Sequence, residues 1–147
     1  MTRIDFAFGV RHRLRAACEV VHKHYLAGRR LIVYTRDPQR LAYFDRLLWG
    51  FDPTSFVPHV HSHDPLAAKT AVILADTDPV SARELAGATD AWLLNLDLEC
   101  PPGAESFGRI LEIVSNHEQD REAARARWRQ YQSAGHDLHA HDVSGQH

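Results

Sequence analysis

The chain has 147 residues, of which 44% are hydrophobic, and its formal net charge is -2. This length suits one domain with a substantial core. No apolar run approaches the ~20 residues that a membrane-spanning helix needs, and the chain does not open with a basic segment followed by a long apolar run. We therefore expect a cytoplasmic protein with no membrane partner. The slightly negative net charge also disfavours a protein whose main role is to bind the nucleic acid backbone.

The chain has two cysteines, Cys18 and Cys100. Two cysteines in apolar surroundings can build neither a disulfide framework nor a four-cysteine metal site. This cysteine usage is typical of a reducing cytoplasm.

The first third of the chain alternates between strand and helix patterns. Residues 4–8 alternate as a half-buried strand does, and apolar residues then recur at helical spacing up to Gly28, a helix C-cap. Residues 31–34 form a short apolar run typical of a buried strand, and Asp37-Pro38 marks the start of another helix. The sequence therefore predicts strand, helix, strand and helix before residue 50.

Two later apolar runs, residues 71–75 and 91–96, are predicted to be central strands, because continuous apolar residues suit a sheet covered on both faces. Ser106 is predicted to cap a helix that follows, and a second helix is predicted from about Glu118 to Ser133. The helix after Ser106 would place four apolar residues on one face, Phe107, Ile110, Leu111 and Val114.

Strands separated by helices imply right-handed crossovers and a largely parallel sheet. The predicted fold is a single three-layer α/β domain over residues 1–136, Rossmann-like, with helices on both faces of the sheet. Residues 137–147 show no periodicity and few apolar residues, so we expect a flexible, histidine-rich tail.

Motifs for nucleotide binding or acyl transfer are missing. Neither G-x-G-x-x-G, nor G-x-x-x-x-G-K-[ST], nor G-x-S-x-G occurs in the sequence, so no cofactor is expected. Acidic pairs do follow two of the predicted strands, Asp76 with Asp78 and Asp97 with Glu99. With no catalytic base or metal ligand identified beside them, we interpret these side chains as solvated loop carboxylates.

The histidines offer an enzymatic alternative. His59, His61 and His63 stand at alternate positions, and His139 and His141 repeat the pattern near the end of the chain. An H-x-H pair on a strand can chelate one metal ion, as in amidohydrolases and phosphoesterases of the PHP type, but there it ends the first strand of a much longer barrel. Here one copy follows prolines and the other lies in the predicted tail. The sequence therefore favours a polar loop over the metal site of a hydrolase, and no bound metal is predicted.

Aromatic residues are concentrated in an unusual place, the end of the second predicted helix and the loop after it. Trp49, Phe51 and Phe56 cannot easily all face one core from an irregular segment. Exposed aromatic side chains on a rigid frame are typical anchors of protein interfaces. The alternative is a loop that folds back as a lid on its own core.

A second unusual segment is the last predicted helix, which has four arginines and one glutamate within residues 121–129. Helical geometry places Arg121, Arg125, Trp128 and Arg129 on roughly one face. Guanidinium groups around an indole, with Val114 near them, suit an acidic peptide that carries an aromatic residue. The alternatives are a solvated helix face with Trp128 packed inward, or a surface that binds nucleic acid directly.

Three ordered motifs together resemble the DNA polymerase III chi subunit family: F-D-R-L-L-W at residues 44–49, S-F-V-P-H at 55–59, and A-R-A-R-W-R-Q-Y-Q-S-A-G at 124–135. The resemblance spans nearly the whole chain. It implies a non-enzymatic α/β subunit of the clamp-loader assembly, which pairs with the psi subunit. It also implies binding of the acidic, phenylalanine-ended C-terminal tail of single-stranded DNA-binding protein, so that nucleic acid is contacted only indirectly.

By the same resemblance, the psi-binding residues are expected to be Trp49, Phe51 and Phe56, on a face that can also serve a helicase-like alternative partner. The tail of single-stranded DNA-binding protein is expected to contact five residues, Val114, Arg121, Arg125, Trp128 and Arg129.

Overall fold

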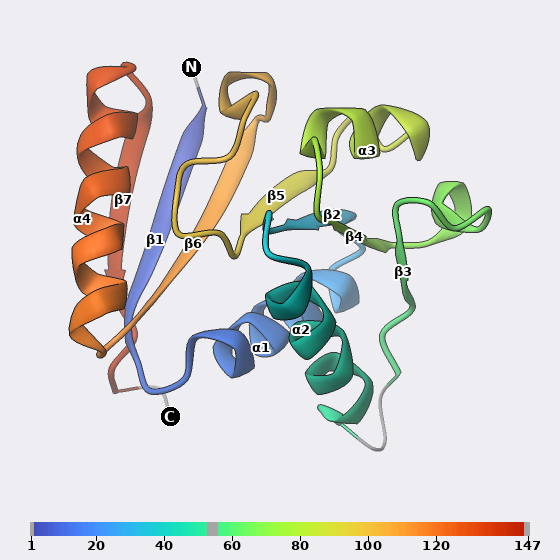
Figure 1. Cartoon of the computed structure of the whole chain (residues 1–147), viewed down its shortest axis with the longest axis horizontal. Helices are drawn as coiled ribbons and strands as arrows, with labels where there is room; N and C mark the ends of the chain where they lie inside the picture. Colours follow the sequence, from blue (N-terminus) through green and yellow to red (C-terminus); the bar gives the residue numbers. More distant parts are fainter. Residues whose placement is uncertain (1, 53–55, 146–147) are drawn as a thin grey trace.

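The computed structural model describes residues 2–52 and 56–145. Within these ranges the strands form one seven-stranded sheet in the order β3-β4-β2-β5-β6-β1-β7, and all of the neighbouring pairs are parallel (Figure 1). The elements in chain order are β1 (Arg3–Val10), α1 (Arg13–Leu26), β2 (Leu31–Tyr34), α2 (Pro38–Gly50), β3 (His59–His61), β4 (Val72–Ala75), α3 (Pro79–Leu85), β5 (Trp92–Asn95), β6 (Arg109–Ser115), α4 (Glu118–Ser133) and β7 (Asp137–Asp142).

The central strand β2 shows how the three layers form. Its side chains alternate between the two faces of the sheet, and both faces are buried. Leu31 and Val33 pack into a core with α1 and α2, whereas Ile32 and Tyr34 pack into a second core with α3 and α4. The predicted α/β fold, with a largely parallel sheet and helices on both faces, is therefore confirmed.

Two helices begin with the same sequence signature, an aspartate followed by proline. The Asp37 side chain accepts a hydrogen bond from the backbone N–H of Gln39 at 3.0 Å and caps α2, as predicted. Asp78 caps α3 in the same way, by accepting from the N–H of Val80 at 3.0 Å, although this short helix is not predicted from the sequence. In the part of the chain that the structure describes, the helices are not long and apolar enough to span a bilayer.

The predicted helix after Ser106 is wrong. The chain makes a short 3-10 turn at Ala104–Ser106 and then forms strand β6, which pairs with β5 on one side and β1 on the other. Six of the seven residues of β6 are buried, because helices cover both faces of the sheet there. A short run that is apolar on both faces satisfies the helical pattern as well as the strand pattern, and β6 contains the β-branched residues Ile110, Ile113 and Val114, which favour a strand.

The prediction of a tail without regular structure is wrong for residues 137–142. These residues form β7, an edge strand paired in parallel with β1. The N–H of Asp137 donates to the Thr2 carbonyl at 2.9 Å, the N–H of Val143 donates to the Phe8 carbonyl at 3.0 Å, and Leu138 packs against the core. An edge strand needs few apolar residues, so its composition resembles that of a tail. Residues 146 and 147 of the predicted tail lie outside the described residues.

Candidate partner-binding sites

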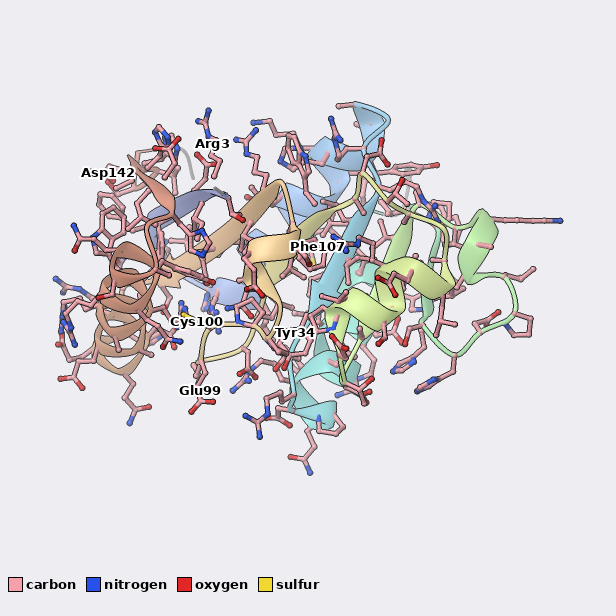
Figure 2. The ribbon with its side chains drawn as sticks, turned by 90° about the horizontal axis from the view of Figure 1, so that it is seen from above. Arg3, Tyr34, Glu99, Cys100, Phe107 and Asp142 are labelled. Carbon is pink, nitrogen blue, oxygen red and sulfur yellow. The ribbon has the colours of Figure 1, made fainter. Side chains whose placement is uncertain are left out.

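A groove of about 450 Å³ lies between α4 and the end of the sheet that β6, β1 and β7 form. Asp142, the last residue of β7, is one of its lining residues and is labelled in Figure 2. Apolar side chains line much of the groove, and two arginines of α4 border it. The apolar lining residues are Phe6, Phe8, Val114, Ala124, Trp128 and Ala140.

Four of the five residues predicted to receive a peptide tail line this one groove, Val114, Arg121, Arg125 and Trp128. The fifth, Arg129, is exposed and is not among the lining residues. Trp128 is half-buried, and its ring centroid lies 5.2 Å from that of Phe6. The indole thus packs inward against the sheet and also presents a surface to the groove.

The groove arginines are paired on the surface with one carboxylate. Glu118 lies 3.0 Å from the Arg125 guanidinium and 3.8 Å from that of Arg121. Both arginine side chains are at least half exposed, at 50% and 56%. Exposed ion pairs of this kind contribute only about 0–1 kcal/mol. A carboxylate from a ligand can therefore compete with Glu118 for these guanidinium groups at little cost.

Arg127 differs from the other arginines of α4, because its side chain points into the core. Its Nε donates to Glu112 at 3.1 Å, and both side chains are almost fully buried, at 3% and 0% exposure. The Glu112 carboxylate also accepts from the Tyr131 hydroxyl at 2.7 Å and the Asn95 amide at 2.9 Å. This buried network fixes α4 on the sheet and so positions the groove arginines.

A second surface lies at the end of α2 and in the segment that leads into β3. Trp49 and Phe56 are each 58% exposed, with ring centroids 5.0 Å apart, and the ring of buried His59 lies 4.9 Å from that of Trp49. His59 is held by Asp45, 2.8 Å from Nε2, and by the Val57 carbonyl, 2.7 Å from Nδ1. His59 thereby ties α2 to the segment that carries Phe56.

The structure separates Phe51 from the other two residues of the predicted psi-binding set. Phe51 is partly buried against the core under α1, and its ring lies 5.9 Å from that of His22. Residues 53–55 of this aromatic segment lie outside the described residues. The exposed aromatic pair consists of Trp49 and Phe56.

The structure corrects the predictions for His59–His61 and for Asp97. His59–His61 is strand β3, paired with β4, and not a loop. Asp97 is buried and accepts hydrogen bonds from the Thr35 hydroxyl and the Arg36 N–H, both at 3.0 Å, so it is not a solvated carboxylate. The burial of Asp97 could not be predicted from the local sequence, because its hydrogen-bond partners lie 61 and 62 residues earlier in the chain.

A larger polar cleft of about 950 Å³ lies at the carboxyl ends of β2 and β4, where α/β folds often bind ligands. Figure 2 shows two of its lining residues, Tyr34 and Cys100. Burial raises the pKa of Tyr34 to about 12 and that of Cys100 to about 11. Both groups are therefore neutral near pH 7, and neither supplies an activated nucleophile.

The comparisons with known proteins point to one family. The family described as "DNA polymerase III chi subunit, HolC" matches residues 1–139. The chain is 30% identical over 145 residues to DNA polymerase III subunit chi of Pseudomonas aeruginosa, with 96% of each chain covered. It is 25% identical over 129 residues to DNA polymerase III subunit chi of Haemophilus influenzae, with 86% of this chain and 85% of the relative covered. The chain belongs to the DNA polymerase III chi subunit family.

Proposed function

We propose that this chain is a non-catalytic adaptor within the DNA polymerase III holoenzyme, which bridges the psi subunit and the C-terminal tail of single-stranded DNA-binding protein. The observation that carries the proposal is the groove beside α4, where Arg121, Arg125 and Trp128 surround an apolar floor. Its mixed lining suits a peptide that ends in an aromatic residue and carries several carboxylates.

The energetics of such a contact favour weak binding. Burial of one phenyl side chain contributes about 1.5–3 kcal/mol, and one charge-assisted hydrogen bond adds about 1.5–3 kcal/mol. The loss of translational and rotational freedom on association offsets much of this gain. We therefore expect a dissociation constant in the micromolar range, which corresponds to about -8 kcal/mol, and weaker binding at high salt.

Weak binding of one tail is compatible with a stable assembly. When several identical tails are displayed on one strand of DNA, the effective concentration of tails near the groove is high. A tether made of such contacts holds the subunit near the strand, yet each contact releases quickly.

The exposed aromatic pair supports the second half of the proposal. Trp49 and Phe56 form an exposed aromatic surface with His59 beneath them, and such side chains are frequent hot spots of interfaces. This surface leads into β3, at one edge of the sheet, whereas the groove adjoins β7 at the opposite edge (Figure 1). The two surfaces are therefore far enough apart for two partners to bind at once.

The groove is tested by calorimetric titration of the purified chain with an acidic peptide ending in phenylalanine. Wild type is expected to bind at micromolar concentration, and Arg125→Ala and Trp128→Ala are each expected to weaken binding by at least about tenfold, the loss of about 1.4 kcal/mol. Arg15→Ala is the control, because Arg15 is an exposed arginine of α1 that does not line the groove. Circular dichroism of each variant separates lost binding from lost folding.

Absence of binding by folded wild-type protein, or equal loss in the Arg125 and Arg15 variants, would contradict the assignment of the groove. The same titration with bare single-stranded DNA tests the nucleic-acid alternative. Tight binding with a steep salt dependence would favour that alternative.

The aromatic pair is tested by co-purification of the chain with a psi subunit. Trp49→Ala and Phe56→Ala are expected to lose the complex on size-exclusion chromatography. Tyr43→Ala is the control, since Tyr43 is also exposed on α2, at 50%, but has no part in the pair. A complex that survives both substitutions would show that psi binds elsewhere.

A further inference from the structure

Three potential metal ligands lie together at the carboxyl edge of β3 and β4. His61, His63 and Asp76 each offer one ligand atom, and these atoms lie within 4.8 Å of one another. The His61 Nε2 atom is 3.5 Å from Asp76 Oδ1, and the rings of His61 and His63 are stacked with centroids 4.3 Å apart. No other such group of three or more occurs in residues 2–52 and 56–145.

The parallel sheet is the reason that these residues meet. His61 pairs with Leu74 in register, so the residues that follow each strand emerge at the same edge of the sheet. The turn after β3 is held by its backbone: the N–H of Ser62 donates to the Leu74 carbonyl at 2.8 Å, and the N–H of Asp64 donates to the His61 carbonyl at 2.9 Å. The Ser62 hydrogen bond therefore joins the histidine turn to β4, and Asp76 directly follows the same strand.

The ligand set and its spacing suit a divalent transition metal. Zn²⁺ binds imidazole nitrogen and carboxylate oxygen at about 2.0–2.2 Å in a tetrahedral arrangement, which separates neighbouring ligand atoms by roughly 3.4 Å. The His61–Asp76 separation already matches this value. The ligand atom of His63 lies within 4.8 Å of the other two, and because this side chain is exposed, a rotation of its ring can bring the nitrogen to the spacing of a tetrahedral site. Three protein ligands leave a fourth position open to water or to another ligand.

We propose that His61, His63 and Asp76 bind one divalent transition-metal ion, Zn²⁺ in the first instance, at the carboxyl edge of β3. The sequence favours no metal at His59, His61 and His63, but it does not show that Asp76 lies beside two of these histidines, and the structure excludes the third. The ring nitrogens of His59 are occupied by Asp45 and the Val57 carbonyl, which leaves it no free nitrogen for a metal.

Metal binding at Nε2 changes the tautomer of His61. The N–H of His63 points to Nδ1 of His61 at 3.4 Å, which in the metal-free protein favours the proton on Nε2, facing Asp76. A neutral imidazole that binds a metal through Nε2 keeps its proton on Nδ1, so the proton moves from Nε2 to Nδ1 and the contact from the His63 N–H is given up.

The test uses the full chain without an affinity tag, treated with a chelator and then titrated with ZnCl₂ by calorimetry. Native mass spectrometry measures the number of ions bound. We expect one ion per chain, and at least about tenfold weaker binding in His61→Ala, His63→Ala and Asp76→Asn. Co²⁺ in place of Zn²⁺ is expected to give the absorption bands of tetrahedral coordination, and these bands should be lost in each variant.

The double variant His139→Ala/His141→Ala is the matched control, since it removes an H-x-H pair elsewhere in the chain and leaves the proposed site intact. Thermal unfolding of the metal-free variants shows whether each one is folded. Failure of the folded wild type to bind one ion would overturn the proposal. Binding that survives in the three site variants, or is lost only in the double variant, would overturn it as well.

Discussion

The buried pair of Arg127 and Glu112 allows a sharp test of how α4 is held on the sheet. Arg127→Met removes the positive charge but keeps a long side chain with good helix propensity. It leaves the Glu112 carboxylate, which is 0% exposed, without its cation. Loss of one partner of a buried pair costs about 3–5 kcal/mol. Tyr131 and Asn95 continue to donate to this carboxylate, so we expect the lower end of that range, about 3 kcal/mol.

Urea unfolding followed by circular dichroism measures this loss. For a domain of this size, 3 kcal/mol corresponds to a drop in melting temperature of roughly 6–12 °C. Arg125→Met is the matched control on the same helix, because the exposed pair of Arg125 and Glu118 should be worth less than about 1 kcal/mol. A double variant, Arg127→Met with Glu112→Gln, is expected to recover part of the loss, because it leaves no buried charge. Similar stabilities of the two Met variants would refute this reasoning.

Two further predictions concern titratable groups. Burial by itself would raise the pKa of Asp5, but hydrogen bonds from His141 and two arginines outweigh it and lower this pKa from 3.8 to about 2. The resulting stabilisation is present above about pH 4 and is lost as the pH falls towards 2, so Asp5→Asn should flatten the pH dependence of the unfolding free energy in that window. An unchanged slope would contradict this. Burial also raises the pKa of Cys18 to about 12 and that of Cys100 to about 11. Both thiols should therefore react with DTNB at about pH 8 only once urea unfolds the chain, and rapid labelling of Cys18 in the folded protein would be the contrary result.

The elements that could be predicted from the sequence are those with local signals. The buried run of β2 and the aspartate–proline start of α2 are each specified within a few residues. The strand β6 was mistaken for a helix, because a strand buried on both faces has no period-2 pattern that distinguishes it from a helix. The strand β7 was mistaken for a tail, because its stability comes from pairing with β1 and not from its own composition.

The residues of the candidate sites also differ in whether a local sequence signal identifies them. The groove arginines Arg121 and Arg125 could be assigned to one face from their spacing along α4 alone. The inward orientation of Arg127 could not, because it depends on Glu112 in another element. The cluster of His61 and Asp76 depends on the register between β3 and β4, which has no local signature.

The pairing of β1 has a consequence for how the chain folds as it is made. Arg3 pairs with Arg109 on one side and with Asp137 on the other, so during synthesis β1 has no neighbouring strand until more than a hundred residues have followed Arg3. At ~5–20 residues per second this interval is roughly 5–20 s. Ile4 and Phe6, which are buried in the finished sheet, remain without partners during that time. Such a delay exposes an unpaired apolar strand to chaperones and to other nascent chains. The contacts of β1 with β6 and β7 have the largest sequence separation in the sheet, and contacts of this kind are expected to limit the folding rate.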